Sequence, residues 1–331
     1  MIIPRFWAEG HIKHQQKAGT AQKARQITVR RFGWSDASQA EAQLHADRRT
    51  EEALEKIIAG VNISRRELKV PYNGAEGLPI REEIIRQQGD TIVTRNAYGA
   101  QCLNTPHVFF ADIDFDGESP VWLTLTVFAA LSLCGALAGW LSGAKSVFFL
   151  LLGVAAIAAS SLAGWIYKKV QDVSGGAQAR ARQRIDRFID ENPGWNFRIY
   201  QTPAGLRVMA THQTFSPDDP AVARCFAALQ ADPVYALMCL RQQCFRARVS
   251  AKPWRIGIDR HLKPQPGVWP VSPERLPARA AWIADYEEKA QSFAACRFWT
   301  SVGSGVVDAA VAPVQQWHDE LSKAALQLPM A

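Results

Sequence analysis

Several patterns that identify familiar chemistries are missing from this chain of 331 residues. There is no glycine-rich loop of the kind that holds phosphate in P-loop proteins or dinucleotides in Rossmann folds. No Ser-His-Asp or Cys-His arrangement can be assigned from spacing. The chain also does not open on the apolar segment of a secretory signal, because Met1 leads within a few residues into mixed polar sequence. Function therefore has to be inferred from weaker patterns.

Cysteine is scarce as well, with six residues in the whole chain. So few cysteines in a chain of this length do not predict a disulfide framework. Cys134 lies in an apolar run, and the other five are typical of reduced cytoplasmic thiols. Cys239 and Cys244 could supply half of a zinc site, but no second pair or neighbouring histidine completes it.

Charge is missing from one long stretch, and this is the strongest signal in the sequence. Between Glu118 and Lys168 the only charged residue is Lys145. It lies in a short loop between two apolar runs, at about 121–141 and 147–167, and about twenty such residues cross a bilayer as a helix. The sequence therefore predicts a transmembrane helical hairpin with the lipid bilayer as its partner. The alternative is a pair of buried helices in a large soluble core.

Basic residues predict the orientation of this hairpin. Those that follow the second run are Lys168, Lys169, Arg180, Arg182, Arg184 and Arg187, whereas the loop has only Lys145. Positive residues stay on the cytoplasmic side, so we expect an integral membrane protein with two spans and both termini in the cytoplasm. The net charge of +7 is modest and comes largely from this stretch, so nucleic-acid binding is permitted but not implied.

Hydrophobic periodicity and turn residues predict strands and helices on both sides of the hairpin. Expected strands lie at 5–13, 25–32, 82–88, 91–98, 107–115, 197–202, 206–211, 245–250 and 254–259. Expected helices lie at about 36–59, 177–190, 220–230, 233–242, 278–298 and 306–328. No linker isolates either half. We therefore expect an α+β fold in which 1–118 and 170–331 form one mixed-sheet cytoplasmic domain, interrupted by the hairpin at 119–169.

One of these strands ends in acidic residues. It contains Asp112 and Asp114, which are two residues apart and therefore point to the same side of a strand. Paired carboxylates at a strand end suit Mg²⁺ or Mn²⁺, and such a metal holds phosphates in nucleotidyl or glycosyl transfer. The alternative is a strand end whose acids are solvated or paired with arginines.

Three segments occur in a suggestive order. They are Asp112-Ile113-Asp114, the strand–turn–strand Thr202-Pro203-Ala204-Gly205-Leu206-Arg207-Val208, and Trp254-Arg255-Ile256-Gly257-Ile258-Asp259. Together they resemble the motifs of the archaeo-eukaryotic primase–polymerase superfamily. The resemblance implies that Asp112, Asp114 and Asp259 are catalytic carboxylates that bind the metal. Arg207 stands where that family has its nucleotide-binding histidine and would face the phosphates. His212 follows five residues later.

Further candidates surround these segments. A basic cluster consists of Arg246, Arg248, Lys252 and Arg255. These side chains could bind phosphate or a nucleic-acid backbone, or they could form a solvated sheet face or pair with the acids. A turn before the acidic strand, with Arg95, Asn96, Tyr98 and Asn104, is expected to line the same cleft.

Three functions remain open at this point. The first is a membrane-anchored, divalent-metal-dependent protein of primase–polymerase-like fold that handles nucleotides or nucleic acid. The second is a metal-dependent transferase that uses a nucleotide-linked sugar. The third is a non-catalytic membrane-anchored α+β module that binds a partner or small ligand. The sequence does not decide whether the chain is an enzyme.

Overall fold

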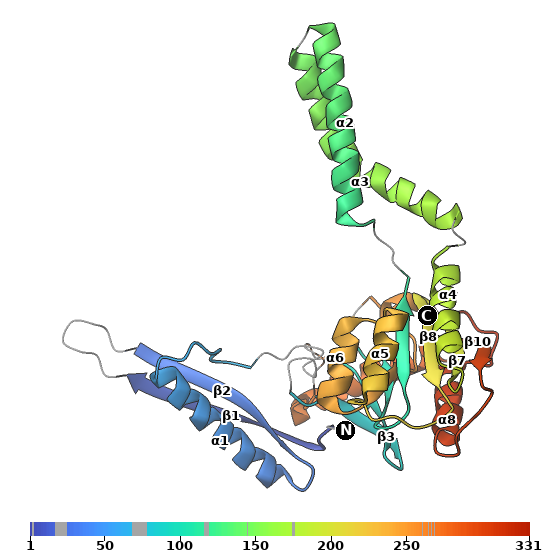
Figure 1. Ribbon diagram of the computed structural model, residues 1–331. Helices are drawn as coiled ribbons and strands as arrows, with labels where there is room; N and C mark the ends of the chain where they lie inside the picture. The colour runs from blue at the N-terminus through green and yellow to red at the C-terminus, as the bar shows by residue number, and fades with distance from the viewer. Residues whose placement is uncertain are drawn as a thin grey trace.

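The computed structural model describes residues 1, 3–16, 25–67, 78–115, 119–143, 145–173, 176–259, 261–263, 265, 267 and 269–331 (Figure 1). It confirms the predicted α+β class. The named strands of the described residues form one two-stranded and two four-stranded sheets, and their pairings are antiparallel. Two apolar helices interrupt the chain between β6 and β7.

The N-terminal unit is a strand hairpin covered by one helix. Strands β1 (Phe6–Gln16) and β2 (Arg25–Ser35) pair with each other, and α1 (Gln39–Ile58) packs on them. Ser38 caps the helix by accepting a hydrogen bond from the Glu41 amide. The helix lies very close to the strands.

The first four-stranded sheet has the order β3-β4-β5-β9. Its strands are β3 (Glu83–Gln88), β4 (Thr91–Arg95), β5 (Gln101–Thr105) and β9 (Phe245–Arg248). The hairpin expected around Gly89 is present as β3 and β4. Strand β5 was not expected, because the sequence there reads as a turn.

The second four-stranded sheet has the order β10-β7-β8-β6. Its strands are β10 (Arg297–Gly303), β7 (Asn196–Thr202), β8 (Gly205–Ala210) and β6 (Phe110–Asp114). Strand β6 precedes the apolar helices, and the other three follow them. Both four-stranded sheets therefore combine strands from the two sides of the interruption.

Helices surround these sheets. They are α4 (Gly176–Glu191), α5 (Pro220–Leu229), α6 (Pro233–Gln242), α7 (Leu276–Ala290) and α8 (Ala312–Ser322), with short 3-10 turns η2 (Pro253–Arg255) and η3 (Pro273–Arg275). Helices α4, α5, α6 and α8 share the hydrophobic core of the sheets, and α7 packs in a smaller cluster with Ala251, Ile256 and Ile258. Asp219 and Asp232 cap α5 and α6, and proline occupies the first turn of each.

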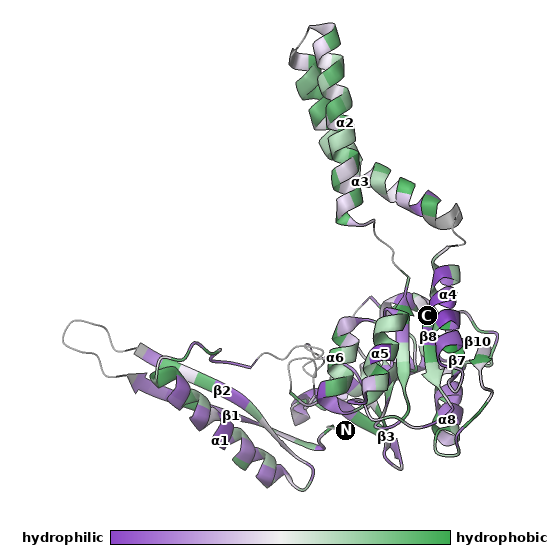
Figure 2. Cartoon of the chain, in the orientation of Figure 1, coloured by the Kyte–Doolittle hydropathy of each residue, from purple (hydrophilic) through white to green (hydrophobic). Residues whose placement is uncertain are grey.

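The apolar pair consists of α2 (Val121–Ser142) and α3 (Lys145–Val173), which pack against each other. Both are long and apolar enough to cross a membrane, and in their most apolar windows only 11% and 17% of residues are buried. Figure 2 shows the hydrophobic colour running along this projecting hairpin. Gly139 allows close contact, since a Cβ there would lie 2.8 Å from the Cβ of Phe148.

Two predictions in the C-terminal half are wrong. Residues 254–259 do not form a strand: Pro253 starts the turn η2, and Gly257 has a φ of +74°, which an extended strand does not allow. The helix expected at 278–298 ends at Ala290, and the chain enters β10 at Arg297.

Candidate anion-binding pocket

The candidate site lies where the two four-stranded sheets meet. The outer strands at this meeting are β6 and β9, and the Tyr235 side chain of α6 joins them. Its hydroxyl lies 3.1 Å from the carbonyl oxygen of Phe110 on β6, and it accepts a hydrogen bond of 3.1 Å from the Arg246 amide on β9. Because the two edges are joined by side chains and not by a continuous strand ladder, space for a cavity remains between them.

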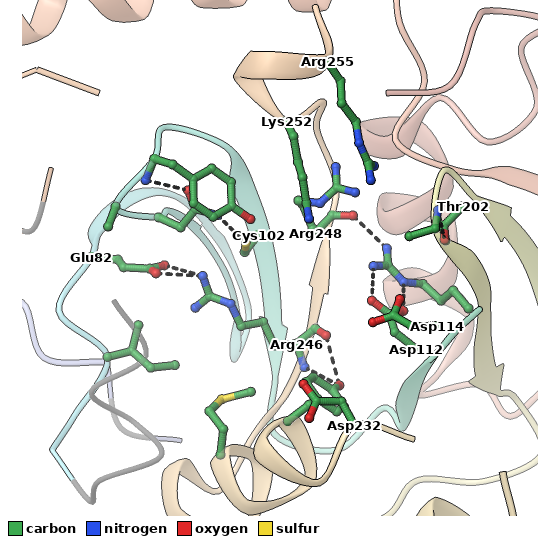
Figure 3. Close-up of a pocket in the computed structure, with 18 of the residues that line it drawn as sticks. Glu82, Cys102, Asp112, Asp114, Thr202, Asp232, Arg246, Arg248, Lys252 and Arg255 are labelled. Carbon is green, nitrogen blue, oxygen red and sulfur yellow. Dashed lines mark hydrogen bonds and ion pairs between the residues drawn. The ribbon is translucent and has the colours of Figure 1, made fainter. Parts of the chain in front are cut away.

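That cavity has a volume of about 210 Å³ and is rich in charged side chains. Its cationic lining residues are Arg81, Arg207, Arg246, Arg248, Lys252 and Arg255, and its anionic ones are Glu82, Asp112, Asp114 and Asp232. The structure thus brings together two of the three predicted carboxylates and five of the six predicted phosphate-binding residues. Asn96 and Tyr98 of the expected cleft-lining turn are also in the lining. Figure 3 shows Lys252 and Arg255 pointing towards Arg248, with Asp112 and Asp114 on the opposite side.

Asp112 is bound by Arg207. The two residues face each other in the antiparallel register of β6 and β8. The guanidinium donates two hydrogen bonds, from Nε to Oδ1 at 2.7 Å and from Nη2 to Oδ2 at 2.9 Å. Burial alone would raise the pKa of Asp112, but the charge and hydrogen bonds of Arg207 outweigh it and hold that pKa below its usual value. Both carboxylate oxygens of Asp112 are therefore engaged.

Arg207 is itself held by groups that the sequence did not reveal. Its side chain is only 2% exposed, and its Nη1 donates to the carbonyl oxygen of Arg248 at 2.7 Å. The same nitrogen approaches Nε2 of the buried His318 within 3.5 Å, and His318 Nδ1 lies 3.1 Å from the Asp319 carboxylate. Burial would lower the pKa of His318, but the hydrogen bond to Asp319 and the adjacent Cys296 thiol raise it. No local motif in the sequence marks this support.

A second ion pair lies on the other wall of the cavity. Arg246 donates from Nη2 to both Glu82 oxygens, at 2.8 and 2.7 Å, and from Nη1 to Asn104 at 3.2 Å. Arg246 was predicted to bind phosphate, but a phosphate would have to compete with Glu82 for its guanidinium. The carboxylate of Asp232 is used as well, since it caps α6 through the Val234 amide.

Three of the cations form no ion pair with an Asp or Glu side chain among the described residues. Arg248 donates to main-chain oxygens, at 2.6 Å to Ser250 and 3.3 Å to the terminal residue Ala331. In the described part of the chain, the buried Nη1 of Arg255 has no hydrogen-bond partner. Burial, and then the charge of Arg248, lower the pKa values of Lys252 and Arg255. Like charges crowded in this way are relieved by an anion.

Of the acidic residues that line the cavity, Asp114 is the one without a partner among the described residues. It is exposed at the end of β6, and its carboxylate forms no hydrogen bond or ion pair with the described residues. Partial burial, and then the neighbouring charge of Asp112, raise its pKa. The two predicted carboxylates therefore lie on one side of the strand, as expected, but have opposite pKa shifts.

Two predicted site residues lie elsewhere. Asp259 is exposed and does not line the cavity. His212 packs against Trp195 and Phe215, its Nδ1 accepts a hydrogen bond from the Asn196 amide, and burial lowers its pKa. The roles implied for them in metal and phosphate binding are not supported by their positions.

The residues expected to bind Mg²⁺ or Mn²⁺ do not fit a metal site in the structure, and neither do the two cysteines considered for zinc. Within the residues described, no group of three or more His, Cys, Asp and Glu side chains could hold a metal ion. The Asp112 oxygens already bind Arg207, and Asp259 is absent from the lining, so the three-carboxylate site for Mg²⁺ or Mn²⁺ is not formed. Cys239 and Cys244 are buried free thiols whose pKa values burial raises, which disfavours the thiolate that zinc requires.

Comparisons with models of protein families, with curated proteins and with solved structures each found no match. The resemblance to the primase–polymerase superfamily therefore stays a prediction from short motifs.

Proposed function

We propose that this protein is a membrane-anchored binding module that holds a phosphorylated small molecule of the nucleotide class in the pocket between β6 and β9. The observation that carries the proposal is the convergence of Arg248, Lys252 and Arg255 on one cavity without Asp or Glu partners among the described residues. A phosphate offers three or more oxygens to such a cluster, and charge-assisted hydrogen bonds of this kind are strong.

The aromatic ring of Tyr98 supports the nucleotide class. It lines the cavity that the cations share, and it packs edge to face on Trp254 with ring centroids 5.2 Å apart. Lys252 lies 5.5 Å from the centroid of the same Trp254 ring. A phosphate on the cations would therefore place the rest of a nucleotide near a flat apolar surface suited to a base.

The ion pair between Asp112 and Arg207 favours a binding function without metal catalysis over the transferase and polymerase alternatives. A carboxylate that accepts two hydrogen bonds from a buried arginine is not available to a cation. The pocket residues then act as positioning groups for an anion, and no step requires a metal.

The membrane part of the proposal rests on α2 and α3. Helices with this hydropathy that leave most of their residues unburied would expose a large apolar surface to water, and a bilayer removes that cost. We place both spans in the membrane and both termini in the cytoplasm, on the basis of the basic residues that follow the second span.

The test is calorimetric titration of the full chain in detergent micelles with ATP in the presence of EDTA. We expect binding without a divalent cation, and a loss of affinity of about tenfold or more in Lys252→Gln and Arg255→Gln, because each removes a charged contact worth about 1.5–3 kcal/mol. Lys56→Gln, at the exposed end of α1, is the control and should bind as the wild type does. No binding, or binding only with Mg²⁺, would contradict the proposal.

A further inference from the structure

One cation of the pocket, Arg81, is buried without a hydrogen-bond partner among the described residues. Its residue is 4% exposed and lines the cavity. Within the described chain, Nε, Nη1 and Nη2 all lack a hydrogen-bond partner. Its guanidinium carbon lies 3.5 Å from the ring centroid of Phe32 and 5.0 Å from that of Trp7. The guanidinium therefore contacts both rings, but its N–H groups still need acceptors.

The nearest acids do not supply those acceptors. Glu9 and Glu67 attract Arg81 electrostatically, but Glu9 is 3.7 Å from Arg30, and Glu67 pairs with Arg49 at 2.6 Å. Burial therefore dominates and lowers the pKa of Arg81 to about 10. Buried charges are normally paired and hydrogen-bonded. Burying Arg81 without acceptors therefore lowers the stability of the folded protein, unless a ligand supplies the counter-charge and the acceptors.

We infer that Arg81 is a second oxyanion subsite of this pocket, so that the ligand carries two anionic groups. One is the phosphate held by Lys252 and Arg255, and the other is a phosphate or carboxylate that Arg81 binds through its guanidinium edge. The inference rests on the proposed function and narrows its ligand to doubly anionic molecules. Arg81 contacts Phe32 of β2 and Trp7 of β1. An anionic group bound to Arg81 would therefore link the N-terminal unit to the pocket.

The two rings explain why the subsite suits arginine. Contact with the two rings holds the guanidinium in place, while its three buried nitrogens have no hydrogen-bond partner among the described residues. This arrangement favours a planar, two-point contact with an oxyanion. A lysine at this position keeps the charge but offers no flat face to the rings and no pair of parallel N–H groups.

Equilibrium dialysis of the full chain in detergent micelles against radiolabelled inorganic phosphate tests this inference. We expect two phosphates per wild-type chain and one per Arg81→Met chain, in which a flexible apolar side chain replaces the buried charge. Arg81→Lys should retain the second phosphate with about tenfold weaker affinity. Arg86→Met removes an exposed charge on β3 outside the lining, and it should still bind two.

The outcomes separate this inference from the proposed function. One phosphate per wild-type chain, lost in Lys252→Gln but unchanged in Arg81→Met, would overturn the second subsite and leave the proposed function standing. Two phosphates in both wild type and Arg81→Met would also overturn it. No phosphate bound by the wild type would reject both proposals. If Arg81→Met does not fold, the affinity of Arg81→Lys decides, and wild-type affinity at both sites would reject the subsite.

Discussion

Two aspartates on the same face of one strand differ in what surrounds them. Asp112 meets the guanidinium of Arg207, whereas Asp114 meets the negative charge of Asp112 and loses part of its hydration. An ionised aspartate therefore stabilises the folded state at position 112 and destabilises it at position 114.

Asp112→Asn is expected to destabilise the protein by about 3 kcal/mol, because Arg207 then remains buried without its counter-charge. Urea unfolding of the full chain in detergent, followed by tryptophan fluorescence, measures the change. Asp285→Asn is the matched control, since it breaks an exposed pair with Lys289 on α7 and should cost less than about 1 kcal/mol. An equally small effect of Asp112→Asn would show that Arg207 does not depend on this carboxylate.

Asp114→Asn is expected to melt at a higher temperature than the wild type at pH 7. The folded-state pKa of Asp114 is raised, so its ionised form opposes folding above that pKa. The advantage of the variant should shrink as the pH falls through the folded-state pKa and vanish below the unfolded-state value of about 3.9. Melting curves at several pH values test this, and a variant that is less stable at pH 7 would contradict it.

At this scale the sequence predicts which side chains share a face but not which are paired. Alternation along one strand is a local property, so Asp112 and Asp114 could be placed together from the sequence. The partner of Asp112 is 95 residues away and is set by the register between β6 and β8. Arg81 gave no signal at all, because its neighbours Trp7 and Phe32 come from a separate part of the chain.

At the scale of elements, the turn between β4 and β5 connects the pocket to α7. Gly99 follows the pocket residue Tyr98 and has a φ of +107°, which side-chain-bearing residues rarely adopt. A Cβ at Gly99 would lie 2.3 Å from the Trp282 ring of α7. Glycine is therefore required both for the backbone conformation and for the contact with the helix.

Gly99→Ala should destabilise the protein by about 1–3 kcal/mol, as expected for backbone strain of this kind. Hydrogen exchange should rise in α7 more than in α5, because the added methyl group displaces Trp282. Gly194→Ala is the control, since a Cβ there meets nothing within 4 Å. Unchanged exchange in α7 would show that the ring can move aside at no cost.

Elements with strong local signals were predictable, and those that depend on context were not. The hairpin between β7 and β8 and the proline-initiated helices α5 and α6 follow from turn and cap residues. Strand β10 was not predicted: its first two residues were included in the helix expected at 278–298 and the rest was left unassigned, because its partner β7 lies about a hundred residues away in sequence. Its alternating contacts exist only once the sheet has formed.

At the scale of the whole molecule, the apolar hairpin follows the pocket residue Asp114 closely in sequence. Asp114 ends β6, and α2 follows Pro120, so six residues of chain span at most about 20 Å. In the proposed arrangement, with the hairpin as a membrane anchor, the pocket faces the compartment that holds the termini. The orientation of the hairpin would then decide which pool of the proposed phosphorylated ligand reaches Lys252 and Arg255.

Cysteine labelling in intact cells tests this orientation. Ser146→Cys, at the start of α3, should react with an impermeant maleimide, whereas Ser272→Cys, beside η3, should react only after the membrane is permeabilised. This expectation follows from the basic residues after α3, which favour a topology with both termini in the cytoplasm. The unmodified chain gives the background, because Cys134 lies within α2 and the other cysteines are buried. Labelling of Ser272→Cys in sealed cells would place the pocket outside, away from cytoplasmic nucleotides, and would remove the proposed ligand class together with the predicted topology.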